Sequence, residues 1–413
     1  MTTATGSTPA LKPYLRLLTA TQFAFNTGFY AVLPYLATHL GDGLGMAGWL
    51  VGLVLGLRTF SQQGLFVVGG ALTDRYGPRP VVLTGCALRI AGFCWLAQAG
   101  TTATVIGAVL LIGFAAALFS PAVESETARA AVAHETATGT PRAQVLAVFS
   151  AAGQAGAFLG PLLGSLLLLL GGDFRTACIA GAVVFVGVLA GHARLMPHRP
   201  RRARTPGTGA VLPREVFANR PFLVLCLTYS SYLLSYNQLY LALPAEVERA
   251  TGSQSALGAL FALSSLLVVV AQLPLTRWSA HRLAPRTALV AGLAVVATGF
   301  AAVPLTPDGP AGLLPAATLV VLLTLGQMLL VPAARGLVPD LVDDHRLGLA
   351  TGALSSVSGL AVLVGSAATG TLLDTPGPVL WTVLTAVPLA GAGLALTLSA
   401  GRRTPEPGAT VTD

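Results

Sequence analysis

The chain has 413 residues, of which 54% are hydrophobic and only 10% are charged, and its mean hydropathy is +0.74. Soluble globular proteins carry about 25% charged residues, so this composition excludes an ordinary soluble domain and predicts a membrane protein. The formal net charge of +8 does not indicate nucleic-acid binding, because the basic residues follow the loops between apolar stretches.

The apolar stretches predict an all-α membrane protein with helices of bilayer-spanning length. A transmembrane helix needs about 20 predominantly apolar residues, and twelve such stretches occur. The predicted helices are 14–38, 47–73, 81–99, 103–127, 142–170, 174–196, 220–246, 254–278, 284–305, 311–338, 346–373 and 378–400.

The distribution of basic residues predicts the orientation of these helices. Loops on the cytoplasmic side of a membrane are enriched in Arg and Lys, and one set of ends holds nearly all of them. On the inner side we place Lys12, Arg16, Arg75, Arg79, Arg89, Arg129, Arg142, the cluster 194–220, Arg277, Arg282, Arg286, Arg335, Arg346, Arg402 and Arg403. The outer loops hold only Arg175 and Arg249. We therefore expect a multi-pass protein of a bacterial cytoplasmic membrane, with an uncleaved first span and both termini cytoplasmic.

The chain divides into two similar halves. We expect an N-terminal six-helix bundle over 1–196, a basic cytoplasmic linker over 197–219, and a C-terminal six-helix bundle with a short tail over 220–413. Residues 74–79 align with residues 281–286, an offset of 207, and residues 118–122 align with 329–333, an offset of 211. Such duplication predicts two pseudo-symmetric bundles with a substrate site between them.

Enzymatic chemistry has no support in the sequence. Cys86, Cys94, Cys178 and Cys226 all lie in apolar runs without paired spacing, which favours small buried side chains over disulfides or a metal site. No nucleotide-binding glycine loop is present, so we expect no cofactor, no ATP-derived energy and the proton gradient as the driving force.

The loop between the second and third predicted helices carries the first informative motif. Gly77 and Pro78 form a turn, and the pattern G-x-L-x-D-R-x-G-x-R spans residues 70–79. It resembles the loop signature of the major facilitator superfamily, although Pro78 stands where that family usually has a basic residue. The resemblance implies a gating role for five residues, with the carboxylate packing against the eleventh helix near Gly348. These gating residues are Gly70, Asp74, Arg75, Gly77 and Arg79.

The fifth predicted helix carries the second motif. Gly156, Gly160 and Gly164 recur every four residues, so another helix can approach closely, and Pro161 permits a bend. The pattern G-x-x-x-G-P-x-x-G resembles the antiporter motif of drug-efflux facilitators, with Ser165 in place of a final glycine. Simple tight packing is the alternative interpretation of the same glycines.

Residues 51–64 are similar to the MdtH-like branch of the bacterial drug:proton antiporter family, and the similarity continues through the Asp74 loop to Arg89. This resemblance implies export of drugs or antiseptics. Within residues 51–64, Arg58 lies near the middle of a membrane-spanning helix, which costs at least about 2.5–3.5 kcal/mol unless the charge is paired or hydrated. We expect it to face the interior, with a carboxylate, backbone carbonyls or water as its partner.

Two acids near the inner end of the fourth helix are candidates for proton coupling. Glu124 follows Pro121 by three residues, and Arg335 follows Pro332 by three, so the repeat places an acid and a base at equivalent positions. We expect this pair to form across the inner gate in one state only. Asp74 and Glu126 are further proton-coupling candidates. Alternatively, one or both of Glu124 and Glu126 extend toward the inner lipid headgroups.

Polar residues in the first and seventh helices predict a substrate cavity. Tyrosines present flat apolar faces with a hydrogen-bonding tip, which suits amphipathic aromatic ligands and cations. The candidate cavity residues are Gln22, Asn26, Tyr30, Arg58, Tyr229, Tyr232, Tyr236, Asn237, Tyr240 and Gln327.

The sequence therefore predicts a monomeric secondary transporter that exports lipophilic or amphipathic compounds in exchange for protons by alternating access. Its expected partners are the lipophilic substrate, protons and the bilayer, with no nucleic acid. The alternative is an importer or symporter of a small polar solute on the same fold. A receptor or scaffold without transport is the third possibility.

Overall fold

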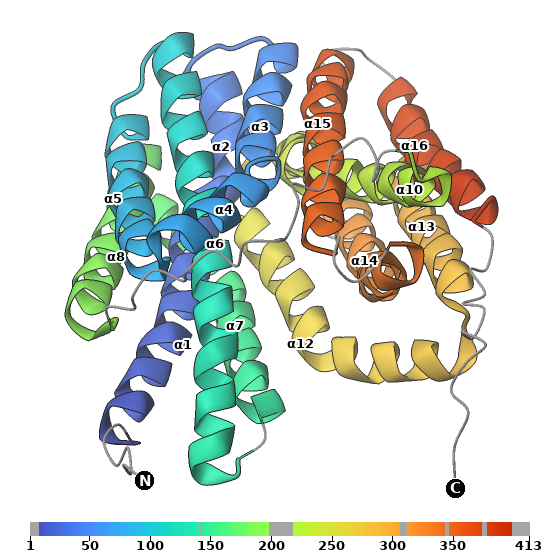
Figure 1. Cartoon of the computed structure of the whole chain (residues 1–413). Helices are drawn as coiled ribbons and strands as arrows, with labels where there is room; N and C mark the ends of the chain where they lie inside the picture. The colour runs from blue at the N-terminus through green and yellow to red at the C-terminus, as the bar shows by residue number, and fades with distance from the viewer. Residues whose placement is uncertain are drawn as a thin grey trace, which may run out of the picture.

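A computed structural model describes residues 8–140, 142–197, 218–305, 312–342, 347–373 and 378–398, and within these ranges the chain is helical without strands. Figure 1 shows two groups of helices side by side, one from each half of the chain. Ten helices of the described part are long and apolar enough to cross a membrane. α1 (Thr8–Tyr30) and α10 (Arg220–Asn237) are not among these ten, and they carry the polar residues predicted to face a cavity.

The N-terminal bundle packs around α1. Its other elements are η1 (Leu33–Tyr35), α2 (Leu36–Thr38), η2 (His39–Gly43), α3 (Gly48–Gln63), α4 (Phe66–Tyr76), α5 (Pro78–Leu96), α6 (Thr102–Thr138), α7 (Arg142–Leu169) and α8 (Phe174–Leu195). Helix α1 contacts α7 and α8, and α5 contacts α6 and α8. The core between them is rich in Phe side chains, among which Phe25, Phe119 and Phe185 contact one another.

The C-terminal bundle begins with α10. Its other elements are η3 (Gln238–Tyr240), α11 (Ala242–Thr251), α12 (Leu257–Arg282), α13 (Pro285–Ala302), η4 (Val303–Leu305), α14 (Leu314–Leu341), α15 (Leu347–Leu373) and α16 (Val379–Leu396). Pro274 lies inside α12, and the helix changes direction along its length in Figure 1. A proline removes a backbone hydrogen bond and kinks a helix in this way.

Several predicted helices differ in their ends. The second predicted helix breaks at Gly64 and Leu65 into α3 and α4, and the fourth continues past its predicted end at residue 127 to Thr138. The first and seventh end early and continue as short 3-10, π or α segments. Hydropathy marks the stretch that lies in lipid, whereas the backbone continues as a helix wherever its hydrogen bonds can be completed.

The two bundles repeat each other in detail. Gly85 of α5 approaches Ala115 and Phe119 of α6, and Gly292 of α13 approaches Gly326 and Leu330 of α14. Gly85 and Gly292 are 207 positions apart, and their partners are 211 positions apart. These are the two offsets found in the sequence repeat, so the duplication extends to side-chain packing.

Two helix pairs join the bundles. α3 packs along α15, and α7 packs against α12. The α3–α15 pair is held very closely, because a Cβ added at Gly52 would lie 1.9 Å from the Ser366 carbonyl oxygen. Gly56 and Gly370 make similar approaches to Leu363 and Gly48. Small residues spaced by four thus form the tightest contact between the halves.

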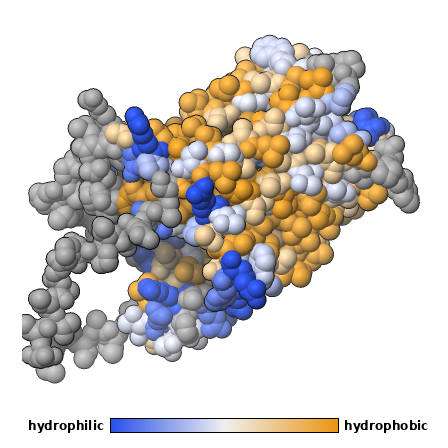
Figure 2. Space-filling model, turned by 90° about the vertical axis from the view of Figure 1, so that its right-hand side faces the viewer, coloured by the Kyte–Doolittle hydropathy of each residue, from blue (hydrophilic) through white to orange (hydrophobic). Residues whose placement is uncertain are grey.

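Apolar side chains cover much of the outer surface. Figure 2 shows one face that is mostly hydrophobic, with hydrophilic residues gathered toward one side. The exposed large side chains include Val183, Val270, Leu273 and Val364, each about two-thirds exposed. An apolar surface of this extent on a helical bundle is the surface that a bilayer covers.

Candidate functional site

A polar bridge crosses the boundary between the two bundles. The Thr59 hydroxyl of α3 donates to Asn237 Oδ1 of α10 at 3.1 Å, and Asn237 Nδ2 donates to Ser366 Oγ of α15 at 2.9 Å. All three side chains are buried. Asn237, predicted to line the cavity, therefore connects helices of both halves. Hydrogen bonds of this kind between membrane helices are each worth roughly 1 kcal/mol.

Four tyrosines form a continuous row beside this bridge. Ring centroids are 5.5 Å apart for Tyr229–Tyr232, 6.0 Å for Tyr232–Tyr236 and 6.2 Å for Tyr236–Tyr240. The row continues to Phe261 of α12 at 5.4 Å. The spacing of three and four residues on α10 and η3 places these rings side by side in one continuous row. That the row lines a substrate cavity stays a prediction.

The polar stripe of α1 lies against the glycine face of α7. A Cβ added at Gly153 would lie 3.1 Å from both the Gln22 and Asn26 amide nitrogens. Gly156 approaches the Phe23 carbonyl oxygen, and Gly160 approaches Thr27 and Tyr30. The predicted close helix approach along Gly156, Gly160 and Gly164 is thus confirmed, with α1 as the partner. Tyr30 also lies within electrostatic range of Tyr236, so the α1 stripe and the tyrosine row face one another.

Arg58 of α3 is interior, as predicted, but its partners differ from those expected. Its guanidinium lies 4.7 Å from the Phe29 ring centroid and 5.9 Å from that of Tyr240, and Nη2 donates to Gln62 Oε1 at 2.8 Å. The side chain is 8% exposed, and its Nε has no hydrogen-bond partner within the described chain. Aromatic faces replace the carboxylate, because the ring quadrupole attracts a desolvated cation.

A second arginine is buried, contrary to the prediction that it lies on the inner side of the membrane. Arg89, assigned to the inner surface, lies inside α5 with 1% exposure and is surrounded by Phe25, Phe29, Phe93 and Phe185 at 5.0 to 5.4 Å. Its Nη1 donates to the Ile112 carbonyl oxygen at 2.9 Å. The sequence does carry an indication of this burial, because Arg89 has apolar residues on both sides, as Arg58 does.

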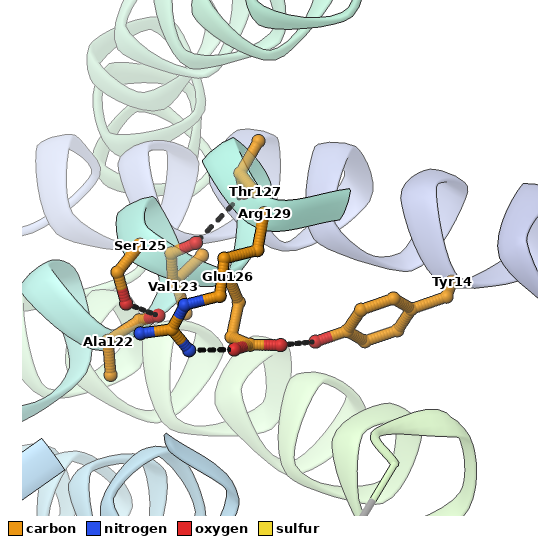
Figure 3. Close-up of polar contacts among 7 residues, drawn as sticks. All are labelled: Tyr14, Ala122, Val123, Ser125, Glu126, Thr127 and Arg129. Atoms are coloured by element: carbon orange, nitrogen blue, oxygen red, sulfur yellow. Dashed lines mark hydrogen bonds and ion pairs between the residues drawn. The ribbon is translucent and has the colours of Figure 1, made fainter. Parts of the chain in front are cut away.

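Glu126 forms a buried junction between α1 and α6 (Figure 3). Tyr14 donates to one carboxylate oxygen at 2.9 Å, and Arg129 contacts the other at 2.5 Å. The Glu126 side chain is fully buried, whereas that of Arg129 is 39% exposed. The interpretation that Glu126 extends to the headgroups is therefore wrong, because a tyrosine and an arginine hold its charge within the protein.

Glu124 and Arg335 occupy the positions that the repeat predicts. Both side chains are exposed, and they lie close enough across the two halves for their charges to attract each other. No ion pair within 4 Å joins them in the described structure, so the predicted gate contact is not formed in this arrangement. Arg335 also lies within electrostatic range of Tyr232, which places it beside the tyrosine row. Gln327, on the same helix α14, is half-buried.

The predicted turn after α4 is present. Gly77 has a φ of 87°, which favours glycine, and Pro78 begins α5. Arg79 Nη2 donates to the Ala193 carbonyl oxygen near the end of α8 at 2.6 Å, whereas Arg75 is exposed over the Tyr76 ring. Gly69 approaches the Ala117 carbonyl closely, whereas a Cβ at Gly70 would meet no atom within 4 Å.

The Asp74 side chain lies outside the described part of the molecule. Its contact with the start of α15 near Gly348 therefore stays a prediction, as does its part in proton coupling.

The end of the bundles where α7 meets α8 is closed by contacts between the halves. Ser165 Oγ shares a hydrogen bond of 2.7 Å with the Tyr35 hydroxyl and donates to the Ser255 carbonyl oxygen at 3.3 Å. Gln254 donates to Thr38 at the same end. Ser165, which replaces the final glycine of the motif, thus connects α7 to the segment before α12.

His39, the first residue of η2, and Asp173, just before α8, lie at this end. His39 stacks on Phe174 at 4.1 Å, and its partial burial lowers its pKa below 6.5. Asp173 begins α8 and accepts hydrogen bonds from the Thr176 amide and hydroxyl, each at 2.8 Å. These bonds lower the pKa of Asp173, because they favour the ionised form.

A largely apolar cavity of about 600 Å³ lies between α7 and α12. Its walls are mostly Ala, Leu, Val and Phe side chains, with Gln154, Gln272 and Ser150 as the polar members. A volume of this size accommodates a drug-sized molecule. The α7–α12 pair is therefore more open than the α3–α15 pair.

The cysteines differ from expectation at one position. Cys86, Cys178 and Cys226 are buried, as expected, but Cys94 is exposed. All four thiols are free. Among the described residues, no group of three His, Cys, Asp or Glu side chains is arranged to hold a metal ion.

A duplicated helical bundle with charged and aromatic residues between its halves defines a membrane transporter. The sequence profile of the Major Facilitator Superfamily matches residues 17–366 and 225–412, and the chain belongs to this family. It is 38% identical over 370 residues to an uncharacterised MFS-type transporter of Mycobacterium tuberculosis (strain ATCC 25618 / H37Rv), covering 87% of this chain and 85% of that one. It is 32% identical over 335 residues to multidrug resistance protein MdtH of Escherichia coli (strain K12 / DH10B), covering 79% and 80%.

Solved structures agree on the fold. The peptide transporter POT in complex with sulfate superimposes with a TM-score of 0.76 at 18% identity, covering 93% of each chain. The nucleoside transporter NupG gives a TM-score of 0.77 at 14% identity, covering 94% of this chain and 98% of that one. At these identities the likeness concerns the fold alone.

Proposed function

We propose that the protein exports lipophilic or amphipathic compounds from the cytoplasm in exchange for protons, by alternating access of its two bundles. The carrying observation is the row from Tyr229 to Tyr240, which lies between the halves and faces Arg58 and Tyr30. Flat, half-apolar rings suit an aromatic cargo. The identity to MdtH and the glycine-rich face of α7 support export over import.

The apolar cavity between α7 and α12 suits entry of such a cargo. Its lining connects to the lipid-facing surface through Leu159, Leu266 and Leu273, which are all exposed. A lipophilic compound partitions into the bilayer, so a side entrance meets it where its concentration is highest. The distribution of arginines supports a bacterial cytoplasmic membrane, with both termini cytoplasmic.

Glu124 is the acid we assign to proton coupling. It is exposed between the halves and within electrostatic range of Arg335, so protonation changes an interaction across the gate. Glu126 is committed to Tyr14 and Arg129 and is closed off from that space. In one transport cycle, a proton on Glu124 weakens its attraction to Arg335 and lets the bundles separate at that end.

The test uses inverted vesicles with an inside-acid gradient and a panel of lipophilic dyes that includes ethidium. We expect dye uptake that depends on the gradient, collapses with a protonophore and loses its gradient dependence in Glu124→Gln. Glu135→Gln is the matched control, because it removes an exposed acid from the far end of the same helix. Uptake only in right-side-out vesicles would instead favour the importer, and no uptake in either orientation would contradict transport of these dyes.

A further inference from the structure

The N-terminal bundle buries two positive charges on the same aromatic ring. Arg58 and Arg89 lie 4.7 and 5.2 Å from the Phe29 ring centroid, so their guanidinium groups are within about 10 Å of each other. Like charges repel strongly at this distance in a medium of low dielectric constant. Neither guanidinium contacts a carboxylate in the described part of the chain, and Nε of both, with Nη2 of Arg89, lacks a hydrogen-bond partner there.

Glu124 and Glu126, two acids of the same bundle, are too far away to neutralise this pair. Glu126 is bound by Tyr14, which precedes Phe29 by 15 residues of α1, or about 22 Å along a helix. Glu124 follows Ile112, the hydrogen-bond partner of Arg89, by 12 residues of α6, or about 18 Å. Arg335 already lies opposite Glu124. The charge around Phe29 is therefore left without a counter-ion from these acids.

Arg58 is the member of the pair that lies next to the C-terminal half. It lies at the boundary between the bundles, 5.9 Å from the Tyr240 ring and next to Thr59, which bonds to Asn237 of the other half. Arg89 is 1% exposed inside the N-terminal bundle and reaches a ligand only through its field. A guanidinium with unused donors at such a boundary binds carboxylates with charge-assisted hydrogen bonds.

We infer that the transported substrate carries an ionised acidic group, a carboxylate on an aromatic or apolar body, and that Arg58 binds this group while the tyrosine row holds the body. The inference rests on the proposed function, since it names the cargo of the same site. It predicts that zwitterionic or anionic amphipathic compounds are preferred over lipophilic cations of the same shape.

The test compares rhodamine B, whose benzoate is ionised at neutral pH, with its ethyl ester, which has the same fluorophore and no carboxylate. Binding to the purified full-length protein is measured by fluorescence anisotropy without a proton gradient. We expect the acid to bind at least about tenfold more tightly than the ester, and Arg58→Gln to remove this preference while affinity for the ester changes little. Arg58→Lys retains part of the preference, because it keeps the charge but loses the planar donor pair.

Arg142→Gln is the matched control. It removes one positive charge from the exposed start of α7, away from the boundary between the bundles, and should keep the preference for the acid. Size-exclusion profiles establish that each variant is folded, and Arg58→Lys remains informative if Arg58→Gln is not. Equal affinity for acid and ester in the unmodified protein would overturn the inference, and so would a preference that survives in folded Arg58→Gln.

The outcome separates the inference from the proposed function. If the ester is exported in response to the gradient and the acid is not preferred, the proposed export function is supported and the role of Arg58 in binding an acidic group is contradicted. If the acid binds more tightly than the ester but neither is transported in vesicles, the anion site at Arg58 is supported and the proposed export function is contradicted.

Discussion

The N- and C-terminal halves share their packing but differ in the charges that they bury. Gly85 and Gly292 make matching helix contacts, and Arg79 and Arg286 each donate to a carbonyl near the end of the last helix of their half, at Ala193 and Leu396. At the same offset of 207, however, Arg58 corresponds to Ser265 and Arg89 to Val296, and all four are buried.

This difference indicates a division of labour. Helix contacts and turn contacts are needed to fold either half, so both halves retain them. Buried charges cost free energy in a membrane. The N-terminal half buries the arginine pair and Glu126, whereas the described part of the C-terminal half buries Glu246, which is paired with Arg249 in α11. The C-terminal half contributes the tyrosines, with Asn237 and Ser366 in the polar bridge. The buried arginines of the site therefore belong to the first half, and its tyrosine row belongs to the second.

Replacing Glu126 with the residue at its counterpart position should have the largest effect on stability. Leu337 lies 211 positions later, so Glu126→Leu gives the N-terminal half the neutral side chain of the other half. We expect a loss of about 3 kcal/mol in the free energy of unfolding, because Tyr14 and Arg129 lose their buried partner. The measurement is denaturant unfolding in detergent. Glu135→Leu, at the exposed end of the same helix, should cost less than about 1 kcal/mol.

α7 and α15 are equivalent helices of the two halves. A glycine-to-alanine substitution should destabilise the protein more in α7 than in α15. At Gly160 of α7 a Cβ would lie 2.7 Å from the Thr27 carbonyl oxygen, whereas at Gly365 of α15 it would meet the tip of the Leu234 side chain. Backbone cannot move aside as a flexible side chain can. We expect Gly160→Ala to cost about 1–3 kcal/mol and Gly365→Ala clearly less. Equal melting temperatures for the two variants would contradict this view of the α1–α7 contact.

Replacing Arg89 tests whether the buried charge serves stability. Arg89→Met keeps similar volume and makes this position resemble Val296 of the other half. Volume-conserving core changes usually cost less than about 1.5 kcal/mol, and removal of an unpaired buried charge offsets that cost. The melting temperature should therefore stay close to that of the unmodified protein or rise. A large fall would show that the aromatic cage around Arg89 holds the N-terminal bundle together.

The smallest expected effect is a pH dependence of stability that arises from His39 in the N-terminal half. Its folded-state pKa lies below 6.5, so the unfolded chain takes up a proton more readily than the folded chain does. The contribution of His39 is complete above about pH 6.5 and is lost as the pH falls toward the folded-state value. We expect a change below about 1 kcal/mol, since the ring is only partly buried. Thermal unfolding across this range should show it, and His39→Phe, which preserves the stacking on Phe174, should abolish it.

Much of the site could be predicted from local patterns. The tyrosine spacing on α10, the glycine spacing on α7 and the turn at Gly77 each follow from helix or turn geometry, so the sequence places them correctly. The positions of Glu124 and Arg335 opposite each other followed from the internal repeat. The interior position of Arg58 could also be predicted, because exposing an arginine to lipid in mid-membrane costs too much free energy.

The partners of the charged residues could not be predicted in this way. Glu126 lies two residues from Glu124, yet one is closed off by Tyr14 and Arg129 and the other is exposed between the halves. Side chains two residues apart on a helix point to nearly opposite sides, and Tyr14 is 112 residues away in sequence. The cage around Arg89 is likewise built from distant segments, with phenylalanines from α1, α5 and α8.

The sequence by itself determined that this chain is a duplicated helical membrane protein, because hydropathy, Arg placement and repeat offsets are properties of the chain alone. It also determined which residues are too polar to face lipid. The tertiary structure decided how those residues are paired, that α3 and α15 form the tight contact between the halves, and that two arginines share Phe29. Pairing depends on which helix faces which, and that is set only when both bundles are packed together.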